Sequence, residues 1–230
     1  MMSRRLLASG RDADIFEHGA NLVLRRSRDG RSMAAEASVM EFVRSRGFPV
    51  PAVESVSSDG SELIMERIQG PTMVSLLSRK PWLVGSCGRL LASLHIRLHA
   101  LDAPATLQPA PTGDGHRILH LDLHPLNVMM SPRGPVVIDW TGAARGDPDI
   151  DVALTWLLLA VGDVPPGSLA AALSRWGRKR LIAGYLGQFN QASLEKALDP
   201  VVRWKIKDPH MSSREIAAMW ALLHALGRQA

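Results

Sequence analysis

The stretch His120-Leu121-Asp122-Leu123-His124-Pro125-Leu126-Asn127 decides the fold of this chain, together with the run Val136-Val137-Ile138-Asp139-Trp140 that follows it. The second stretch is an apolar run that ends in an aspartate, as expected for a buried strand with a carboxylate at its end. Together they bring two carboxylates and an amide, from Asp122, Asp139 and Asn127, within eighteen residues. The plain alternative is a solvated turn between two core strands, but the complete set favours a chemical site.

The first stretch fits the kinase catalytic-loop pattern H-R-D-L-x-x-x-N at every fixed position except the arginine, where Leu121 stands. Phosphoryl transfer from ATP needs a carboxylate that orients the attacking hydroxyl and accepts its proton. It also needs an amide oxygen and a second carboxylate for the magnesium ion that neutralises the phosphates. The pattern therefore predicts Asp122 as the catalytic base, with Asn127 and Asp139 as ligands of Mg²⁺.

Length and composition allow one large or two small domains with a sizeable core. The chain has 230 residues, 46% of them hydrophobic and 21% charged, as is ordinary for a globular enzyme. The longest apolar stretch, 152–161, is too short to span a bilayer, so we expect no membrane association. No long apolar segment follows the N-terminus, and Cys87 is the only cysteine. These features favour a cytoplasmic protein.

The net charge of +5 raises the question of a nucleic-acid partner. The basic residues are scattered, and the densest run is Arg178-Lys179-Arg180. A solvated helix face explains such a run better than a binding stripe does. We expect no nucleic-acid partner, and a basic nucleic-acid-binding protein is kept as the weaker alternative.

The first 66 residues predict five antiparallel strands and one helix. The strands are expected over residues 4–8, 14–17, 21–26, 53–57 and 62–66. Ser32 is expected to cap a helix over 33–46, which Gly47 ends.

The remainder predicts mainly helices. They are expected over residues 82–101, 150–161, 168–189 and 212–227, with a loop over 103–115 and a hairpin over 128–138. Pro200 and Pro209 are expected to interrupt the stretch between the last two helices. The predicted class is α+β, in a two-lobed, protein-kinase-like fold. A small antiparallel-sheet N-lobe over 1–67 would bind the nucleotide, and a mainly helical C-lobe over 68–230 would hold the catalytic loop and the acceptor.

Two charged residues of the N-lobe suit a nucleotide site. Side chains alternate along a strand, so Val23 and Arg25 share one face of the strand 21–26. Val23 would cover the adenine, and the planar guanidinium of Arg25 matches phosphate oxygens. Glu36, early in the next helix, is placed to pair with Arg25. Arg26 is the alternative if the register is shifted by one residue, and two exposed, opposite charges are the plain alternative.

Further nucleotide contacts are expected at the hinge and in the first turn. Adenine is usually read by backbone groups after the last N-lobe strand, which points to Glu66 and Ile68. Gly10 lies where a glycine-rich phosphate loop would be, although no G-x-G-x-x-G is present.

Several residues around the catalytic loop are expected to support it. His124 would orient the loop by hydrogen bonds, with acid–base catalysis as the alternative, and His120 opens the motif. Asp151 begins a very apolar helix, either as its cap or as an acceptor for backbone amides of the loop. His95 and His99 are four residues apart but lack a third ligand nearby, which favours a core or surface role over a metal site.

These residues resemble the aminoglycoside phosphotransferase family, whose members are kinase-like small-molecule phosphotransferases. Typical members carry a stretch like H-G-D-L-H-P-G-N and a later I-D-W. The resemblance covers about residues 5–160 and includes Met65-Glu66, Gly70-Pro71, Leu94-His95, Leu98–Leu101, Gly146–Pro148 and Asp151–Ala153.

The resemblance implies ATP and Mg²⁺ as cofactors, a small-molecule hydroxyl acceptor, Asp122 as base, Asn127 and Asp139 as metal ligands, and Arg25 with Glu36 as the phosphate-contacting pair. The chain departs from the family at three points. Leu121 and Leu126 replace usual glycines, Arg25 replaces the usual lysine, and the chain is short where C-terminal helices build the acceptor pocket.

The charge of the C-terminal segment bears on the chemical class of the acceptor. From Val161 to Ala230 the sequence carries ten Lys/Arg and five Asp/Glu. A polycationic aminoglycoside is attracted by an acidic pocket, so this basic segment favours a neutral or anionic hydroxyl compound. The competing hypothesis is a non-catalytic, kinase-like nucleotide-binding regulatory module. The intact set of Asp122, Asn127 and Asp139 argues against it, whereas Arg25 and the short C-lobe argue for it.

Overall fold

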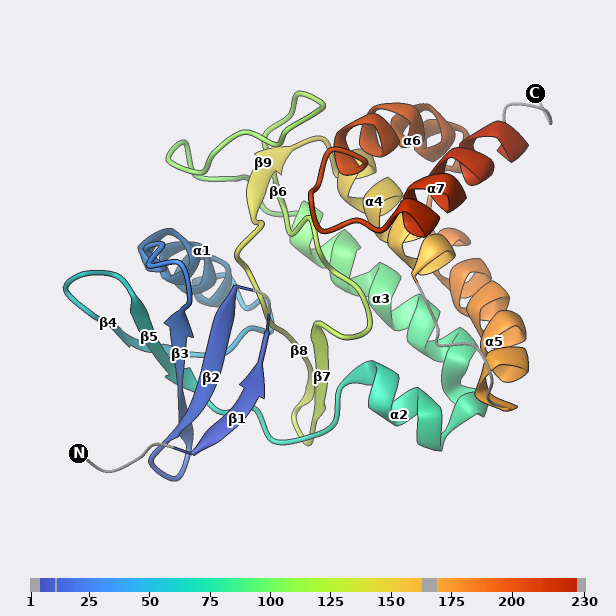
Figure 1. Ribbon diagram of the computed structural model, residues 1–230. Coiled ribbons are helices and arrows are strands. Elements are labelled where there is room, and N and C mark those ends of the chain that lie inside the picture. Colours follow the sequence, from blue (N-terminus) through green and yellow to red (C-terminus); the bar gives the residue numbers. More distant parts are fainter. Residues whose placement is uncertain (1–4, 11, 163–168, 227–230) are drawn as a thin grey trace.

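A lobe rich in β-strands and a helical lobe lie side by side in the computed structural model (Figure 1). The structure describes residues 5–10, 12–162 and 169–226. The predicted α+β, kinase-like fold is confirmed, with an antiparallel sheet first and mainly helices after it. The proposed boundary at residue 67 stays a prediction.

The N-terminal sheet is antiparallel with the strand order β1-β2-β3-β5-β4. Its strands are β1 (Leu6–Ser9), β2 (Ala13–His18), β3 (Leu22–Ser27), β4 (Val53–Val56) and β5 (Glu62–Glu66). Arg25 of β3 lies opposite Ile15 of β2 and Leu63 of β5. The middle strand therefore carries the predicted phosphate-binding arginine.

Helix α1 (Ala34–Ser45) packs against β4 and buries Val39, Met40 and Val43. Gly47 ends it in a left-handed conformation, with φ of 76°, as predicted. The predicted cap at Ser32 is wrong by one residue, because Met33 is at the N-cap position. The Ser32 hydroxyl still accepts a weak hydrogen bond from the Ala34 N–H, at 3.3 Å.

The C-terminal part contains six helices among the described residues, together with a short 3-10 turn and two small sheets. The helical elements are α2 (Met73–Arg79), η1 (Pro81–Leu83), α3 (Val84–His99), α4 (Pro148–Val161), α5 (Leu169–Leu186), α6 (Gln191–Lys205) and α7 (Ser213–Leu226). The strands are β6 (Arg117–Leu119), β7 (Val128–Ser131), β8 (Gly134–Val137) and β9 (Ala144–Gly146). Pairs β6–β9 and β7–β8 are antiparallel and bracket the predicted site.

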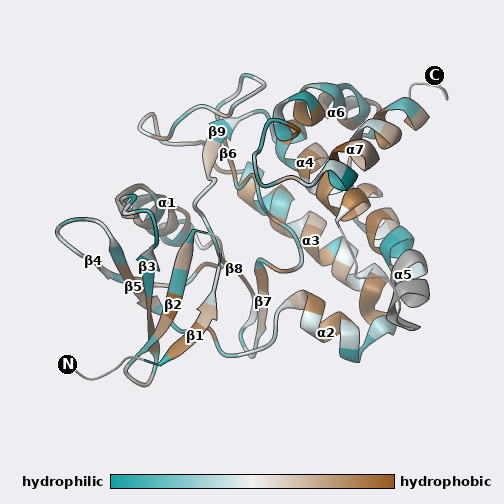
Figure 2. Ribbon diagram, in the orientation of Figure 1, coloured by the Kyte–Doolittle hydropathy of each residue, from teal (hydrophilic) through white to brown (hydrophobic). Residues whose placement is uncertain are grey.

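Helix α4 lies at the centre of this part, with α5, α6 and α7 packed against it. Its side chains from Ile150 to Leu157 are all at least 92% buried. The surrounding helices carry both hydrophobic and hydrophilic segments (Figure 2). Each fully buried leucine stabilises the fold by about 1.5–3 kcal/mol. This core contacts the predicted catalytic loop, because Thr155 of α4 donates a hydrogen bond to the Leu123 carbonyl. No helix of the described chain combines the length and hydropathy of a membrane span.

The prediction that prolines interrupt the chain between α5 and α7 is wrong for Pro200, which lies inside α6. Asn190 caps this helix by accepting from the Ala192 N–H at 3.1 Å. Proline removes one helical hydrogen bond, and the burial of Leu198 and Val201 beside it offsets that loss. Helices α2 and α6 were not predicted, and neither were the strands β6 and β9, which have three residues each.

Candidate active site

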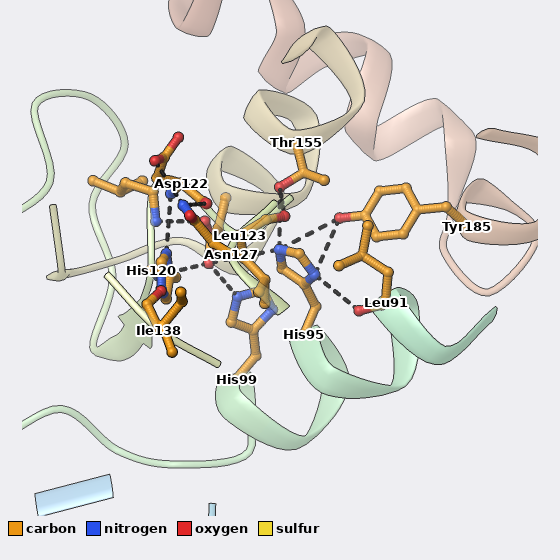
Figure 3. Close-up of polar contacts among 12 residues, drawn as sticks. Leu91, His95, His99, His120, Asp122, Leu123, Asn127, Ile138, Thr155 and Tyr185 are labelled. Atoms are coloured by element: carbon orange, nitrogen blue, oxygen red, sulfur yellow. Dashed lines mark hydrogen bonds and ion pairs between the residues drawn. The ribbon is translucent and has the colours of Figure 1, made fainter. Parts of the chain in front are cut away.

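The loop between β6 and β7 presents Asp122, whose carboxylate is held by two neighbours, of which Asn127 is labelled in Figure 3. The side-chain amide of Asn127 donates to the backbone carbonyl and to Oδ2 of Asp122, both at 2.9 Å. Nε2 of His124 lies 3.3 Å from Oδ1. The side chain of Asp122 stays 35% exposed. Both oxygens of the carboxylate are thus held by the protein, while the side chain stays partly exposed.

The protonation of Asp122 suits a proton acceptor. Burial alone would raise the pKa of its carboxyl, but the hydrogen bond from His124 and nearby positive charge, including that of Lys205, more than offset this. Its pKa is therefore lowered. Nδ1 of His124 accepts from the Leu126 N–H at 3.3 Å, so the ring proton belongs on Nε2, facing Asp122. This contact is what the predicted orienting role of His124 requires.

Asp151 holds the backbone of the same loop. Its fully buried carboxylate accepts from the N–H groups of His120 and Leu121, at 2.9 and 2.8 Å, and lies 2.9 Å from Nε2 of His99. Burial would raise its pKa, but the His99 contact and the amides hold the pKa well below its usual range. Asp147, instead, caps α4 by accepting from the Asp149 N–H. Asp151 was predicted either to cap the helix or to accept from backbone amides of the loop. The geometry matches the second of these roles.

Leu121, which stands where the family usually has glycine, adopts a left-handed conformation with φ of 59°. Side chains other than glycine pay about 1–2 kcal/mol there. Its N–H is fixed by Asp151 and its side chain is 92% buried. The other departure, Leu126, leaves its side chain 55% exposed beside Asn127.

A second polar chain ties the loop to the helical core through His95 (Figure 3). Thr155 of α4 donates to the carbonyl of Leu123 at 2.9 Å, and its hydroxyl lies 3.3 Å from Nε2 of His95. Nδ1 of His95 lies 3.1 Å from the carbonyl of Leu91 and 3.4 Å from the Tyr185 hydroxyl. The core interpretation of His95 matches this setting. Thr155 and Tyr185 gave no signal in the sequence.

Burial of His95 predicts a pH dependence of stability. Desolvation lowers its pKa from 6.5 to about 4. The unfolded imidazole therefore binds a proton between pH 6.5 and 4 that the folded one does not. Above pH 6.5 the titration of His95 takes nothing from the free energy of unfolding. As the pH drops to 4, this free energy should fall by up to about 3 kcal/mol because of His95. His120, whose pKa burial also lowers, acts in the same direction.

Urea unfolding at several pH values between 7 and 4 measures this slope. A His95→Gln variant should show a shallower slope than the wild-type protein, even if it is less stable at pH 7. Equal slopes in the two proteins would contradict the assignment to His95.

Arg25 reaches from the middle strand to the turn after β8. Its guanidinium forms a short ion pair with Oε1 of Glu36, and its Nη2 donates to Oδ1 of Asp139 at 3.0 Å and to the Thr141 hydroxyl at 2.8 Å. Arg25 and Glu36 are both 93% buried. Burial raises the pKa of Glu36, opposed by the charge of Arg25.

Arg26 points away from this cluster. Its Nη2 lies 2.7 Å from Oε1 of Glu62, its side chain is 48% exposed, and its guanidinium lies 5.1 Å from the centre of the Phe16 ring. Side chains alternate along β3, and the side chain of Arg25, rather than that of Arg26, lies in the interior.

The remaining predicted nucleotide contacts lie outside the cluster around Asp139. The carboxylate of Glu66 pairs with Arg133 at 2.6 and 2.8 Å and accepts from the Ala52 N–H at 3.1 Å. Its backbone N–H donates to the Ala52 carbonyl at 2.8 Å, so both the carboxylate and this N–H already have partners within the protein. Ile68 is half-buried between β5 and α2. The Gly10 N–H donates to the Ala13 carbonyl and closes the turn before β2.

The donors of Asn127 and Asp139 fit a magnesium ion. They supply an amide oxygen and a carboxylate, the hard oxygen ligands that Mg²⁺ prefers. No group of three His, Cys, Asp or Glu residues among those described could hold a metal ion alone. Magnesium in nucleotide enzymes commonly completes its shell with phosphate oxygens and water, so two protein ligands suffice.

Comparisons with known proteins agree with this architecture. The sequence matches the Phosphotransferase enzyme family (APH) over residues 3–113 and 96–187. A search of curated proteins gives no significant match.

Solved structures with the same fold include the gentamicin complex of APH(2")-IIa. That structure has 16% identity and a TM-score of 0.61, and the match covers 95% of this chain and 91% of that one. An aminoglycoside-3'-phosphotransferase of type VIII shares 18% identity with a TM-score of 0.60, over 95% of this chain and 90% of that one. A choline/ethanolamine kinase family protein from Mesorhizobium loti shares 16% identity with a TM-score of 0.59, over 97% and 87%. The family match spans most of the chain, and these structures share its fold: the chain belongs to the APH phosphotransferase family.

Proposed function

We propose that the protein transfers the γ-phosphoryl group of Mg-ATP to a hydroxyl of a small molecule. The observation that carries this proposal is the carboxylate of Asp122. Its pKa is lowered, Asn127 and His124 hold it in place, and its side chain is partly exposed. Structural relatives support the donor, because they were solved with ADP or with ATP and streptomycin.

The predicted residues of the loop and of the cluster around Arg25 have distinct roles in this proposal. Asp122 orients the acceptor hydroxyl and takes its proton as the bond from the acceptor oxygen to the γ-phosphorus forms and the bond from that phosphorus to ADP breaks, so that ADP leaves. Asn127 and Asp139 hold Mg²⁺, which neutralises the phosphate charge when bound. Arg25, kept in place by Glu36, contacts the phosphates. Asp151 and His120 keep the loop in the conformation that aims Asp122.

Replacing Arg25 should be far more damaging than replacing Arg26. The loss of charge-assisted hydrogen bonds in Arg25→Ala should raise the apparent KM for ATP and lower turnover, by about tenfold to a hundredfold together. Arg26→Ala removes only an exposed ion pair with Glu62 and should change either value by less than about threefold. Steady-state kinetics at varied ATP test this. If Arg26→Ala is the damaging change, the cleft-facing register is wrong.

The acceptor is proposed to be neutral or anionic. The charge of Lys205, in the last turn of α6, is close enough to lower the pKa of Asp122. Lys205 is partly balanced by Asp208, whose carboxylate lies 2.8 Å away. A cationic acceptor would enter against the excess of positive charge in the last 70 residues, and desolvating it there is costly.

Aminoglycosides are therefore expected to be poor substrates, although structural relatives were solved with gentamicin or hygromycin B. Kinetics with kanamycin-like compounds, sugars, nucleosides and amino alcohols at fixed ionic strength test this. Efficient transfer to an aminoglycoside, with kcat/KM of about 10⁴ M⁻¹s⁻¹ or more, would overturn the charge argument.

A further inference from the structure

Thr141 lies two residues after Asp139, at the meeting point of both lobes. Its hydroxyl oxygen lies 2.8 Å from Nη2 of Arg25, 3.0 Å from Oδ1 of Asp139 and 3.3 Å from Oε2 of Glu36. We infer that Thr141 is a positioning residue that fixes Arg25 and Asp139 relative to each other for binding of the magnesium-nucleotide. The inference rests on the proposed function, because it concerns the same nucleotide site.

The hydrogen bonds of this hydroxyl have one consistent direction. Arginine only donates, so the Thr141 oxygen accepts from Nη2 of Arg25. The single proton of the hydroxyl then goes to a carboxylate, and the contact to Asp139 is the shorter of the two. Oδ1 of Asp139 thus receives two donors, from Arg25 and from Thr141. No hydrogen bond from a described residue reaches Oδ2, and the side chain is 42% exposed. Asp139 therefore has one oxygen held by the protein and one left for a ligand.

The backbone gives this contact more weight. Asp139 adopts a left-handed conformation, with φ of 64°, which is uncommon for residues other than glycine. The next residue, Trp140, donates its N–H to Oε1 of Glu36 at 3.3 Å. The turn 139–141 is therefore attached to α1 through Trp140 and Thr141, and to β3 through Arg25. Without the Thr141 hydroxyl, the turn 139–141 would lose a contact that fixes the orientation of the Asp139 carboxylate.

The need for this hydroxyl comes from the arginine at position 25. A guanidinium presents five donors in a rigid fork, whereas a lysine presents three on one nitrogen. Nε of Arg25 is already buried without a hydrogen-bond partner among the described residues. Without Thr141, Nη2 would keep only Asp139 as acceptor, and a buried donor left unpaired is costly. A lysine at position 25 would make no such demand, so the effects of the two positions should be coupled.

The test compares Thr141→Val, which keeps the shape but lacks the hydroxyl, with Thr141→Ser, which keeps the hydroxyl. Each is made in the wild-type and the Arg25→Lys background. Isothermal titration with a non-hydrolysable ATP analogue, with Mg²⁺ and with a chelator, gives the gain in affinity due to the metal. Thr141→Val should reduce the affinity for the magnesium-nucleotide by about 10–100-fold and that for the metal-free nucleotide by less. Thr141→Ser should stay close to the wild type. In the Arg25→Lys background, Thr141→Val should cost less than about threefold.

Three results would overturn the inference alone, each in a protein whose wild type shows the metal-dependent gain. They are an unchanged gain in Thr141→Val, equal damage in Thr141→Ser, and equal loss for both nucleotide forms together with a lower melting temperature. If the wild-type protein itself shows no gain with Mg²⁺, the proposed function fails and the inference fails with it.

Discussion

Asp122→Asn should reduce phosphoryl transfer by about 10²–10⁴-fold while leaving the fold and most of the nucleotide binding intact. Asparagine has nearly the same shape, and its oxygen can still accept a hydrogen bond from Asn127 or His124. It cannot take the proton of the acceptor hydroxyl, so only orientation remains. Turnover with saturating ATP and a responsive acceptor measures the rate, and titration with nucleotide checks binding.

Asp114→Asn is the matched control, because Asp114 is exposed in the loop before β6. It should keep wild-type turnover. Near-normal turnover in Asp122→Asn, with its folding verified, would remove the assignment of Asp122 as the base.

Asp151→Asn should lower the free energy of unfolding by about 3–5 kcal/mol, because it removes one partner from a buried charged network. The carboxylate accepts from two backbone N–H groups and contacts His99. An asparagine offers one oxygen, so its NH₂ group must face at least one of these donors. Turnover should fall as well, since the two amides belong to His120 and Leu121 of the catalytic loop.

Asp149→Asn is the control for this change, since Asp149 lies on the same turn of α4 but is half-buried. Burial and the charge of Asp147 raise the pKa of Asp149, so its ionised form gains no net stabilisation from folding. Urea unfolding at pH 7 compares the two variants. A loss in Asp151→Asn no larger than in Asp149→Asn would contradict the role given to Asp151.

The sequence was most informative where chemistry needs a local pattern. The octet around Asp122 and the apolar run before Asp139 belong to contiguous segments, and the strands of the N-lobe follow a simple alternation. The same alternation put Arg25 and Arg26 on opposite faces, with Arg25 preferred for the interior and Arg26 as the alternative. In β3 it is Arg25 that is buried.

The rest depended on contacts between distant parts of the chain. Thr141 contacts Arg25, 116 residues away in the sequence, and Glu66 contacts Arg133, 67 residues away. No local sequence pattern could predict either pair. Asp151 looks like a helix cap in the sequence because it begins a very apolar helix, yet Asp147 is the cap. Pro200 is a local helix breaker, but the burial of α6 against α4 overrides it.

The same contacts bear on the choice between a kinase and a non-catalytic binding module. A binding module would need a stable fold and a nucleotide contact, but not an ionised, accessible Asp122 held by Asn127. The arginine at position 25, in place of the usual lysine, was an argument for the module. Its pairing with Glu36, Asp139 and Thr141 weakens that argument. Arg25 fits the site with its own set of partners.

The most direct test of the central claim is mass spectrometry of hydroxylated metabolites and antibiotics incubated with the purified protein, ATP and Mg²⁺. The account predicts that at least one compound gains a single phosphoryl group with the wild-type protein. That gain should be lost with a chelator and with Asp122→Asn. If the protein binds the magnesium-nucleotide but transfers the phosphoryl group to no compound, and Asp122→Asn binds in the same way, the chain is a nucleotide-binding module and the claim of catalysis is wrong.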